Sequence, residues 1–428
     1  WTSMLTSPCA FEPEYFQRVM LNLILRPDIA STYIFRAEIF YDSFNDPAGT
    51  FLQHVKAEYR PLSCETPAGY ALQQTIVRRM VPRNPQRDDA LVQTCHIYKK
   101  SKGASEEATE EEKNLVIYLP HANSAEAIPF YHPTVHALAF LHTWSPSTPD
   151  PQSTLSIHYS LFPGHPLTPR LTRTALSLLT LINKHSLGQK AGYTKRVHHD
   201  LLVHQAAFQD TYTRLKTKYA RRLIEGWVEQ TPPGKHVFED LGIAAFLIEL
   251  WRGMYGEGKR PFPGFVDIGC GNGVLVYVLL EEGYEGWGFD ARRRKTWDTF
   301  PPHVQQRLQE RVLVPEVLRG GLDTSSPTIH NGIFPPSTFI ISNHADELTP
   351  WTPLLASLSC SPFIAIPCCS HNFTGAKFRA PIQRRNKQPS AYATLCDWVS
   401  RIAEDVGYTP EKEMLRIPST RNVGIVGR

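Results

Sequence analysis

Residues 265–273 read FVDIGCGNG, and this stretch decides the fold. A short apolar run of strand character is followed by Gly269, Gly271 and Gly273, and then by the apolar run VLVYVLLEE. Glycine permits a sharp turn and lets a ligand approach the backbone closely. The pattern predicts a strand, a ligand-binding loop and a helix, which together begin a parallel α/β sheet.

Two acids and one missing glycine indicate which ligand the loop binds. The dinucleotide pattern G-x-G-x-x-G would place a glycine where Val274 stands. Asp267 precedes the first glycine by two residues, where a carboxylate would repel a pyrophosphate but attract the amino group of a methionine moiety. Asp290 ends the next strand-like run, a position from which carboxylates bind ribose hydroxyls. The spacing favours S-adenosylmethionine; NAD and a glycine turn without a ligand are the alternatives.

Alternating apolar runs and helical stretches continue from residue 264, which predicts a doubly wound, mostly parallel sheet. We expect strands at 265–268, 286–289, 311–314, 338–341 and 362–366, helices at 274–282, 303–310, 353–358 and 391–406, and a closing antiparallel pair at 414–417 and 422–426. The residues expected at the cofactor are Asp267, Gly269, Cys270, Gly271, Asn272, Gly273, Asp290, Ala291 and Asn343.

The first half of the chain has a different character. Many of the 35 prolines lie in residues 1–170, which suggests extended segments and ordered loops. Residues 99–113 are acidic and lack large apolar side chains, so a solvated loop is expected there. Apolar residues recur every three or four positions over 208–227, which predicts one long helix. We expect two domains, 1–200 and 201–428.

Composition narrows the class of protein. The 428 residues are 42% hydrophobic, and the net charge of +4 permits a polyanionic partner without requiring one. The longest apolar run, 274–280, is far shorter than the roughly 20 residues that cross a bilayer, so no membrane segment is expected. The eight cysteines lack the spacing of a disulfide scaffold, which favours a reducing compartment, and we expect the cytoplasm.

Polar residues follow the fourth and fifth expected strands, where substrates bind in this kind of sheet. These segments are SNHADELTPW at 342–351 and IPCCSHNF at 366–373. A ribose hydroxyl is a poor nucleophile and needs a base or a nearby cation. Asp346, His344 and His371 are the candidates for that role. The first segment lacks the Asn-Pro-Pro-aromatic signature of amino-methyltransferases, so methylation of a base nitrogen is disfavoured.

Other readings of these segments remain open. Cys368 or Cys369 could add to a pyrimidine ring for methylation at carbon 5, but a nucleophilic cysteine needs a depressed pKa and an exposed position. No paired C-x-x-C spacing is present among the C-terminal cysteines, so no metal site is expected. Arg292, Arg293, Arg294 and Lys295 could contact RNA phosphates or form a solvated face. A catalytically inactive RNA-binding module is a further alternative, which the intact glycine loop disfavours.

The chain resembles the eukaryotic tRNA (uracil-2'-O)-methyltransferases that modify uridine 44 of serine tRNA. The resemblance is carried by FVDIGCGNG, GFDARRRKTW, KHVFEDLGIAAFLIELW, SNHADELTPW and PCCSHNF, and upstream by IPFYHPTVHALAFLH and YTKRVHHD. It implies a class I (Rossmann-like) methyltransferase fold, a 2'-O-methyluridine product and a family-specific N-terminal domain that helps hold tRNA. The pairing of H-x-D-x-L-T at 344–349 with C-C-x-H at 368–371 is also similar to another eukaryotic tRNA 2'-O-methyltransferase family, which acts in the acceptor stem. That similarity supports a set of five site residues, His344, Asp346, Cys368, Cys369 and His371. Whether the reaction needs an accessory protein is left open by the sequence.

Overall fold

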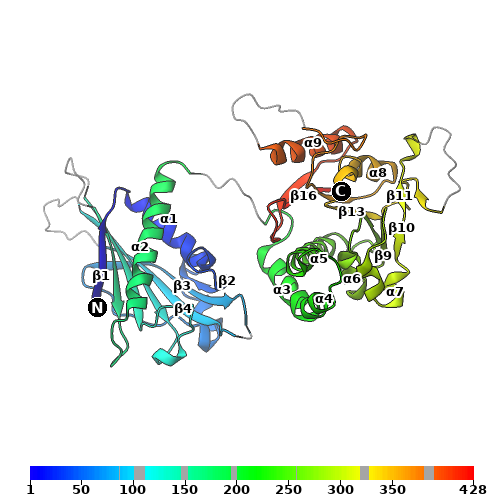
Figure 1. Cartoon of the computed structure of the whole chain (residues 1–428). Helices are drawn as coiled ribbons and strands as arrows, with labels where there is room; N and C mark the ends of the chain where they lie inside the picture. Colours follow the sequence, from blue (N-terminus) through cyan, green and yellow to red (C-terminus); the bar gives the residue numbers. More distant parts are fainter. Residues whose placement is uncertain are drawn as a thin grey trace. The chain divides into compact units, whose positions relative to one another are not determined.

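The computed structural model describes residues 1–85, 87–100, 111–145, 153–193, 200–256, 258–318, 327–379 and 390–428. Most of the acidic loop expected at 99–113 lies outside these residues. The chain divides into two compact units, Trp1–Lys195 and Arg196–Arg428 (Figure 1). Among the described helices, none combines the length and the apolar character that a membrane crossing requires.

The N-terminal unit is an antiparallel sheet with two helices against one face (Figure 1). The strands, in the order β1-β7-β6-β5-β4-β3-β2, are β1 (Thr2–Pro8), β2 (Ile34–Asp42), β3 (Tyr70–Pro82), β4 (Leu91–Lys100), β5 (Glu112–Pro120), β6 (Ala137–Trp144) and β7 (Thr154–Ser160). Helices α1 (Pro13–Leu25) and α2 (Pro169–Lys190) contact each other and the sheet. Phe11, Phe16 and Ile157 are fully buried in the core between them.

The connection between β2 and β3 is held to β4 by hydrogen bonds. The Leu62 N–H donates to Thr94 Oγ1 at 3.0 Å, and the Leu62 carbonyl lies 2.9 Å from His96 Nε2. A separate cluster of buried apolar side chains, including Tyr98 and Ile117, packs with Cys64 of this connection. The proline-rich first half therefore contains extended strands and an ordered connection, as the sequence predicted.

The C-terminal unit is a doubly wound sheet of order β10-β9-β8-β13-β14-β16-β15. Its strands are β8 (Phe265–Ile268), β9 (Gly286–Asp290), β10 (Leu308–Glu310), β13 (Phe339–Asn343), β14 (Phe363–Ile366), β15 (Glu411–Met414) and β16 (Val423–Gly427). The pairs from β10 to β14 are parallel, whereas β16 is antiparallel to both β14 and β15. The expected sheet is present with an antiparallel close, but the first strand of that close, expected at 414–417, lies three residues earlier at Glu411–Met414.

Helices cover both faces of this sheet. The helices of the unit are α3 (Gln205–Leu215), α4 (Arg221–Glu225), α5 (Pro233–Tyr255), α6 (Val274–Glu281), α7 (Pro302–Gln305), α8 (Thr352–Leu358) and α9 (Ala391–Asp405). One buried cluster joins α3, α5 and α6 to the sheet, and a second joins α8 and α9 to it. The helix expected over 208–227 is α3, a π-helical turn (Lys216–Ala220) and α4 in succession.

Two of the expected elements were wrong. Residues 308–310, expected at the end of a helix, form β10 and pair in parallel with β9. Residues 311–314, expected as the third strand, instead contribute β11 (Val312–Leu313), which pairs with β12 (Ile329–His330) outside the main sheet. The four-residue spacing of Val304 and Leu308 is helical in period, but the pairing with β9 overrides it.

The two ends of the C-terminal unit are fastened to each other by one buried carboxylate. Glu413 of β15 is 2% exposed and accepts the backbone N–H groups of Asp200, Leu202 and Val203 at 2.8–3.1 Å. Arg416 adds a hydrogen bond of 2.6 Å to the Asp200 carboxylate. A buried carboxylate needs such donors, because leaving it unpaired would be costly.

Candidate functional site

The glycine loop connects β8 to α6 with a backbone that only glycine adopts easily. Gly269, Gly271 and Gly273 have φ values of +72°, +51° and +77°. A Cβ on Gly269 would lie 3.2 Å from the Ala345 Cβ, whereas a Cβ on Gly271 would meet nothing within 4 Å. The first glycine therefore permits close packing against the loop after β13. The second faces open space, where a ligand can approach the backbone.

Asp290, at the end of β9, holds this loop in place. Its Oδ2 accepts the Gly271 N–H at 3.1 Å, and its Oδ1 accepts the Arg292 N–H at 3.0 Å. The Trp297 indole N–H donates to the Gly271 carbonyl at 2.9 Å. A carboxylate has about four lone-pair sites, so Asp290 can still accept hydrogen bonds from a ribose. Trp297 was not expected at the site.

A group of buried carboxylates lies beside the loop. Asp267 is 1% exposed, and neither of its oxygens has a hydrogen-bond partner among the described residues. Asp240 of α5 accepts the side-chain amides of Asn272 and Asn343 at 3.4 and 3.2 Å. Its neighbour Glu239 lies 3.1 Å from His344 Nε2. Helix α5 thus brings two acids to the ends of the central strands.

The charges of these acids depend on burial and on each other. Burial, reinforced by Asp240 and Asp290, holds the pKa of Asp267 well above its usual range. Burial and the neighbouring Glu239 raise the pKa of Asp240 to about 7. Burial alone would raise the pKa of Glu239, but the hydrogen bond from His344 and the positive charge of the His344 ring lower this pKa below its usual value. A cationic group entering beside Asp267 and Asp240 would favour their ionised forms.

Glu239 and Asp240 were missed by the sequence reasoning. The signal was present, because the pair interrupts the otherwise apolar run of a helix in which the following residues 241–248 are all buried. Two adjacent buried acids in such a helix need partners or a ligand.

The remaining expected cofactor residues take different positions. Asn343 and Asn272 hydrogen-bond to Asp240, and the Asn272 Oδ1 also accepts the Val274 N–H at the start of α6. The Cys270 side chain is buried, and a Cβ on Gly288 would lie 3.0 Å from the Cys270 Cβ and 3.2 Å from its Sγ. Ala291 is exposed just after β9. Most of these residues therefore lie around the loop, whereas the Cys270 side chain is buried and packs against its neighbours.

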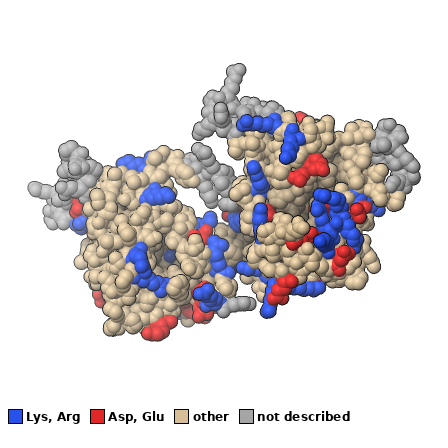
Figure 2. Space-filling view, in the orientation of Figure 1, with Lys and Arg blue, Asp and Glu red and all other residues tan. Residues whose placement is uncertain are grey.

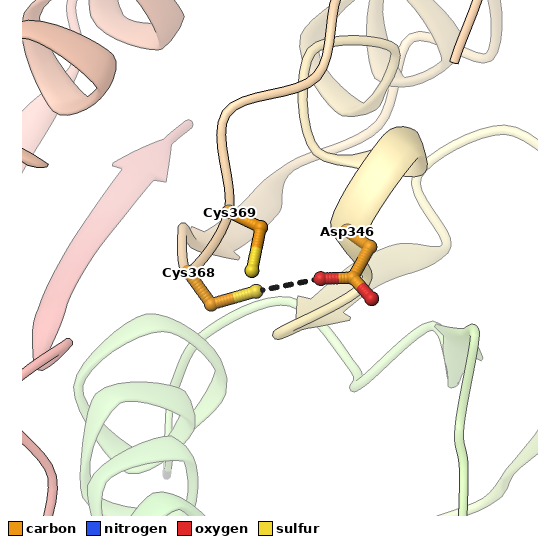
Figure 3. A group of neighbouring side chains, drawn as sticks. All are labelled: Asp346, Cys368 and Cys369. Carbon is orange, nitrogen blue, oxygen red and sulfur yellow. Dashed lines mark hydrogen bonds between the residues drawn. The ribbon is translucent and has the colours of Figure 1, made fainter. Parts of the chain in front are cut away.

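No hydrogen bond joins the three expected catalytic side chains to one another. His344 is paired with Glu239, while Asp346 Oδ1 accepts the Cys368 thiol at 3.1 Å. His371 Nδ1 is shielded from solvent without a partner among the described residues. Asp346, Cys368 and Cys369 lie together at the ends of β13 and β14 (Figure 3). Asp346 and His344 both have positive φ, at +41° and +51°.

The Cys368 thiol is poorly suited to nucleophilic attack. Burial and the hydrogen bond and charge of Asp346 raise its pKa, which keeps the sulfur protonated at neutral pH. Addition to carbon 5 of a pyrimidine requires the thiolate. The geometry at Cys368 therefore disfavours that alternative.

The basic run after β9 is partly neutralised. Arg293 is paired with Asp298 at 2.5 Å, and Arg294 lies 3.5 Å from Asp290. Arg292 and Lys295 are exposed, with no ion pair within the described part of the chain. Figure 2 shows Lys and Arg side chains gathered on the displayed face of the C-terminal unit. The two unpaired cations are the members of the run best placed to bind phosphate.

The arrangement fits S-adenosylmethionine. The unpartnered carboxylate of Asp267 matches a cationic amino group, and the open space at Gly271 matches a ligand that approaches the backbone. The ionised forms of Asp267 and Asp240 would repel a pyrophosphate, whereas a cationic group favours those forms.

Comparisons with known proteins cover both units. A family described as "TRM44-like, N-terminal bet v1-like domain" matches residues 1–196. A second, "Predicted AdoMet-dependent methyltransferase", matches residues 202–315. The second match confirms the class I methyltransferase fold and S-adenosylmethionine as the cofactor, as the sequence predicted.

Curated relatives match along nearly the whole chain. A tRNA (uracil-O(2)-)-methyltransferase of Neurospora crassa is 51% identical, over 100% of this chain and 86% of that protein. Proteins of the same name from Aspergillus oryzae and Schizosaccharomyces pombe are 42% and 41% identical, covering 97% and 100% of this chain and 80% and 85% of their own lengths. The chain therefore belongs to the tRNA (uracil-O(2)-)-methyltransferase family.

Proposed function

We propose that the C-terminal unit transfers a methyl group from S-adenosylmethionine to the ribose 2'-oxygen of a uridine in tRNA. The observation that carries the proposal is the pair of facing regions at the strand ends. The glycine loop follows β8, with the buried Asp267 of β8 and Asp240 of α5 beside it, and Asp346 with its neighbours follows β13 and β14. A donor and an acceptor can thus meet at one edge of the sheet.

Each region has a separate task. S-adenosylmethionine, when bound, supplies a methyl group on a positively charged sulfur. Asp267 and Asp240 bind the amino group, Gly271 admits the ligand to the backbone, and Asp290 accepts hydrogen bonds from ribose hydroxyls. Asp346, with His344 and His371 as the other candidates, favours loss of the proton from the acceptor hydroxyl.

The finer target is serine tRNA at uridine 44, which rests on the sequence resemblance. We further propose that the N-terminal unit helps to hold the tRNA and that Arg292 and Lys295 contact its phosphates. The protein would act in the cytoplasm. The eight cysteines, all free, support a reducing compartment for it.

Nucleoside analysis tests the reaction directly. Serine tRNA incubated with the protein and S-adenosylmethionine should gain 2'-O-methyluridine, and the modified fragment should contain position 44. Formation of 5-methyluridine or 5-methylcytidine would reject the ribose as the acceptor. Calorimetry with S-adenosylmethionine tests the inactive-module alternative, which requires that the intact protein does not bind it.

A further inference from the structure

Asp346 forms a cluster with Cys368 and Cys369, two cysteines to which the proposed methyl transfer assigns no role. Both sulfur atoms and one carboxylate oxygen lie within 4.8 Å of one another, and Cys368 Sγ donates to Asp346 Oδ1 at 3.1 Å (Figure 3). The residues follow two paired strands, because Asn343 of β13 is in register with Ile366 of β14. Their side chains point toward a common centre.

The donor set matches one class of ion. Thiolates select soft or borderline metals and do not suit magnesium or calcium, which take oxygen ligands. Zinc binds sulfur at about 2.3 Å and carboxylate oxygen at about 2.0–2.2 Å, so its ligand atoms lie about 3.5 Å apart in a tetrahedron. The 3.1 Å contact between Cys368 and Asp346 and the 4.8 Å bound on the cluster are compatible with small side-chain rotations around such an ion.

The surroundings leave room for a fourth ligand. Asp346 and Cys369 are exposed and Cys368 is half-buried, so the cluster opens to solvent. Three protein ligands with one open position are characteristic of zinc sites that bind water or substrate, whereas structural zinc sites have four. The three residues follow the ends of two different strands, so they carry no paired C-x-x-C spacing.

We propose that Asp346, Cys368 and Cys369 bind one zinc ion with an open fourth position. Binding displaces the two thiol protons to solvent, since thiolates are the ligands. The ion would lie beside the central strands, and its role in the reaction rests on the proposed function. An acceptor hydroxyl at the fourth position would lose its proton to water more readily, because zinc lowers the pKa of a bound hydroxyl group. Asp346 then acts as a ligand and not as the base.

Metal content and a spectroscopic probe test the site without measuring methyl transfer. The full chain, purified under reducing conditions without chelator, should contain one zinc per molecule by mass spectrometry. Cys368→Ser and Cys369→Ser should lose it. Cys64→Ser, a partly exposed cysteine of the other unit, should retain it. With cobalt in place of zinc, a thiolate-to-cobalt charge-transfer band should appear in the parent and in Cys64→Ser, and be absent from both cluster variants.

Folding and binding controls keep the result interpretable. Circular dichroism and S-adenosylmethionine affinity should be unchanged in Cys369→Ser, because this residue is outside the cofactor-binding set. Equal zinc content in parent and Cys369→Ser would overturn the proposal. So would a mass loss of two hydrogens on the peptide carrying Cys368 and Cys369, which marks a disulfide. A chain that binds no zinc but methylates tRNA would reject the metal site alone. A chain that binds zinc at these residues but does not methylate tRNA would reject the proposed function alone.

Discussion

The donor and acceptor sides of the site are built by opposite means. On the donor side, at the ends of β8 and β9, Asp267 of β8 and Asp240 of α5 are more than nine-tenths buried, and Asp290 fastens the loop. On the acceptor side, after β13 and β14, Asp346 and Cys369 are exposed. The donor side therefore provides preformed buried acids, whose ionised forms a small cation would favour. The acceptor side stays open, as a macromolecular substrate requires.

The difference separates two kinds of prediction. Changes on the donor side should alter affinity for S-adenosylmethionine, while changes on the acceptor side should alter turnover and leave that affinity intact. An acceptor-side variant that loses affinity for S-adenosylmethionine would show that the two sides are coupled.

Asp346→Asn should have the largest effect. Loss of its charge at the acceptor hydroxyl should lower single-turnover methylation at least about 10²-fold, whether Asp346 is a base or a ligand. Calorimetry should show an unchanged affinity for S-adenosylmethionine. Glu347→Gln, which neutralises the adjacent exposed acid, is the matched control. Full activity of Asp346→Asn would place the chemistry elsewhere.

Asp267→Asn should act on the donor side alone. A hydrogen bond to a charged group is worth about 1.5–3 kcal/mol, so affinity for S-adenosylmethionine should fall roughly 10- to 100-fold. The ligand-free protein should not lose stability, because its unpartnered buried carboxylate is replaced by a neutral amide. Calorimetry and thermal denaturation measure the two effects. Undiminished affinity would remove Asp267 from the cofactor site.

The pH dependence of binding reports on Asp240. Its pKa of about 7 means that the carboxyl is neutral below that pH and charged above it. A cationic ligand prefers the charged form, so affinity for S-adenosylmethionine should fall as pH drops below 7, by at most about tenfold per unit. Methylthioadenosine, which lacks the amino group, is the control and should bind with little pH dependence. The same dependence for both ligands would exclude Asp240 as the cause.

The smallest effect is expected at the basic run. Arg292→Ala should weaken tRNA binding about two- to fourfold at low salt and reduce the salt slope by less than about one. Arg293→Ala should change binding less, because Asp298 already neutralises that guanidinium. Filter binding at several salt concentrations compares the two. Equal losses would show that the Arg293 ion pair opens when tRNA binds.

The donor side could be predicted largely from local sequence. A loop between consecutive elements carries Gly269, Gly271 and Gly273, so its glycines and the preceding Asp267 appear as one continuous motif. Asp240 lies 27 residues before Asp267 in the sequence, on another element, and no local pattern connects them. The acceptor residues were identified as a set, but their pairing of Asp346 with Cys368 depends on strand register.

The N-terminal unit was the least predictable part of the fold. Its edge strand β1 pairs with β7, so that Thr2 lies opposite Tyr159. Such pairings depend on long-range burial and leave no periodic signal in a single segment. The same cause explains β10, whose residues 308–310 have helical spacing and become a strand only beside β9.

The carboxylate of Glu413 has a consequence for the order in which the chain is made. Its partner Asp200 is synthesised 213 residues earlier. Residues 200–203 therefore leave the ribosome long before the group that fastens them exists, whereas β8, α6 and β9 follow one another closely and can associate at once. The last strands complete the catalytic unit, so a ribosome that stops before residue 413 releases a glycine loop in a domain whose two ends are still unjoined.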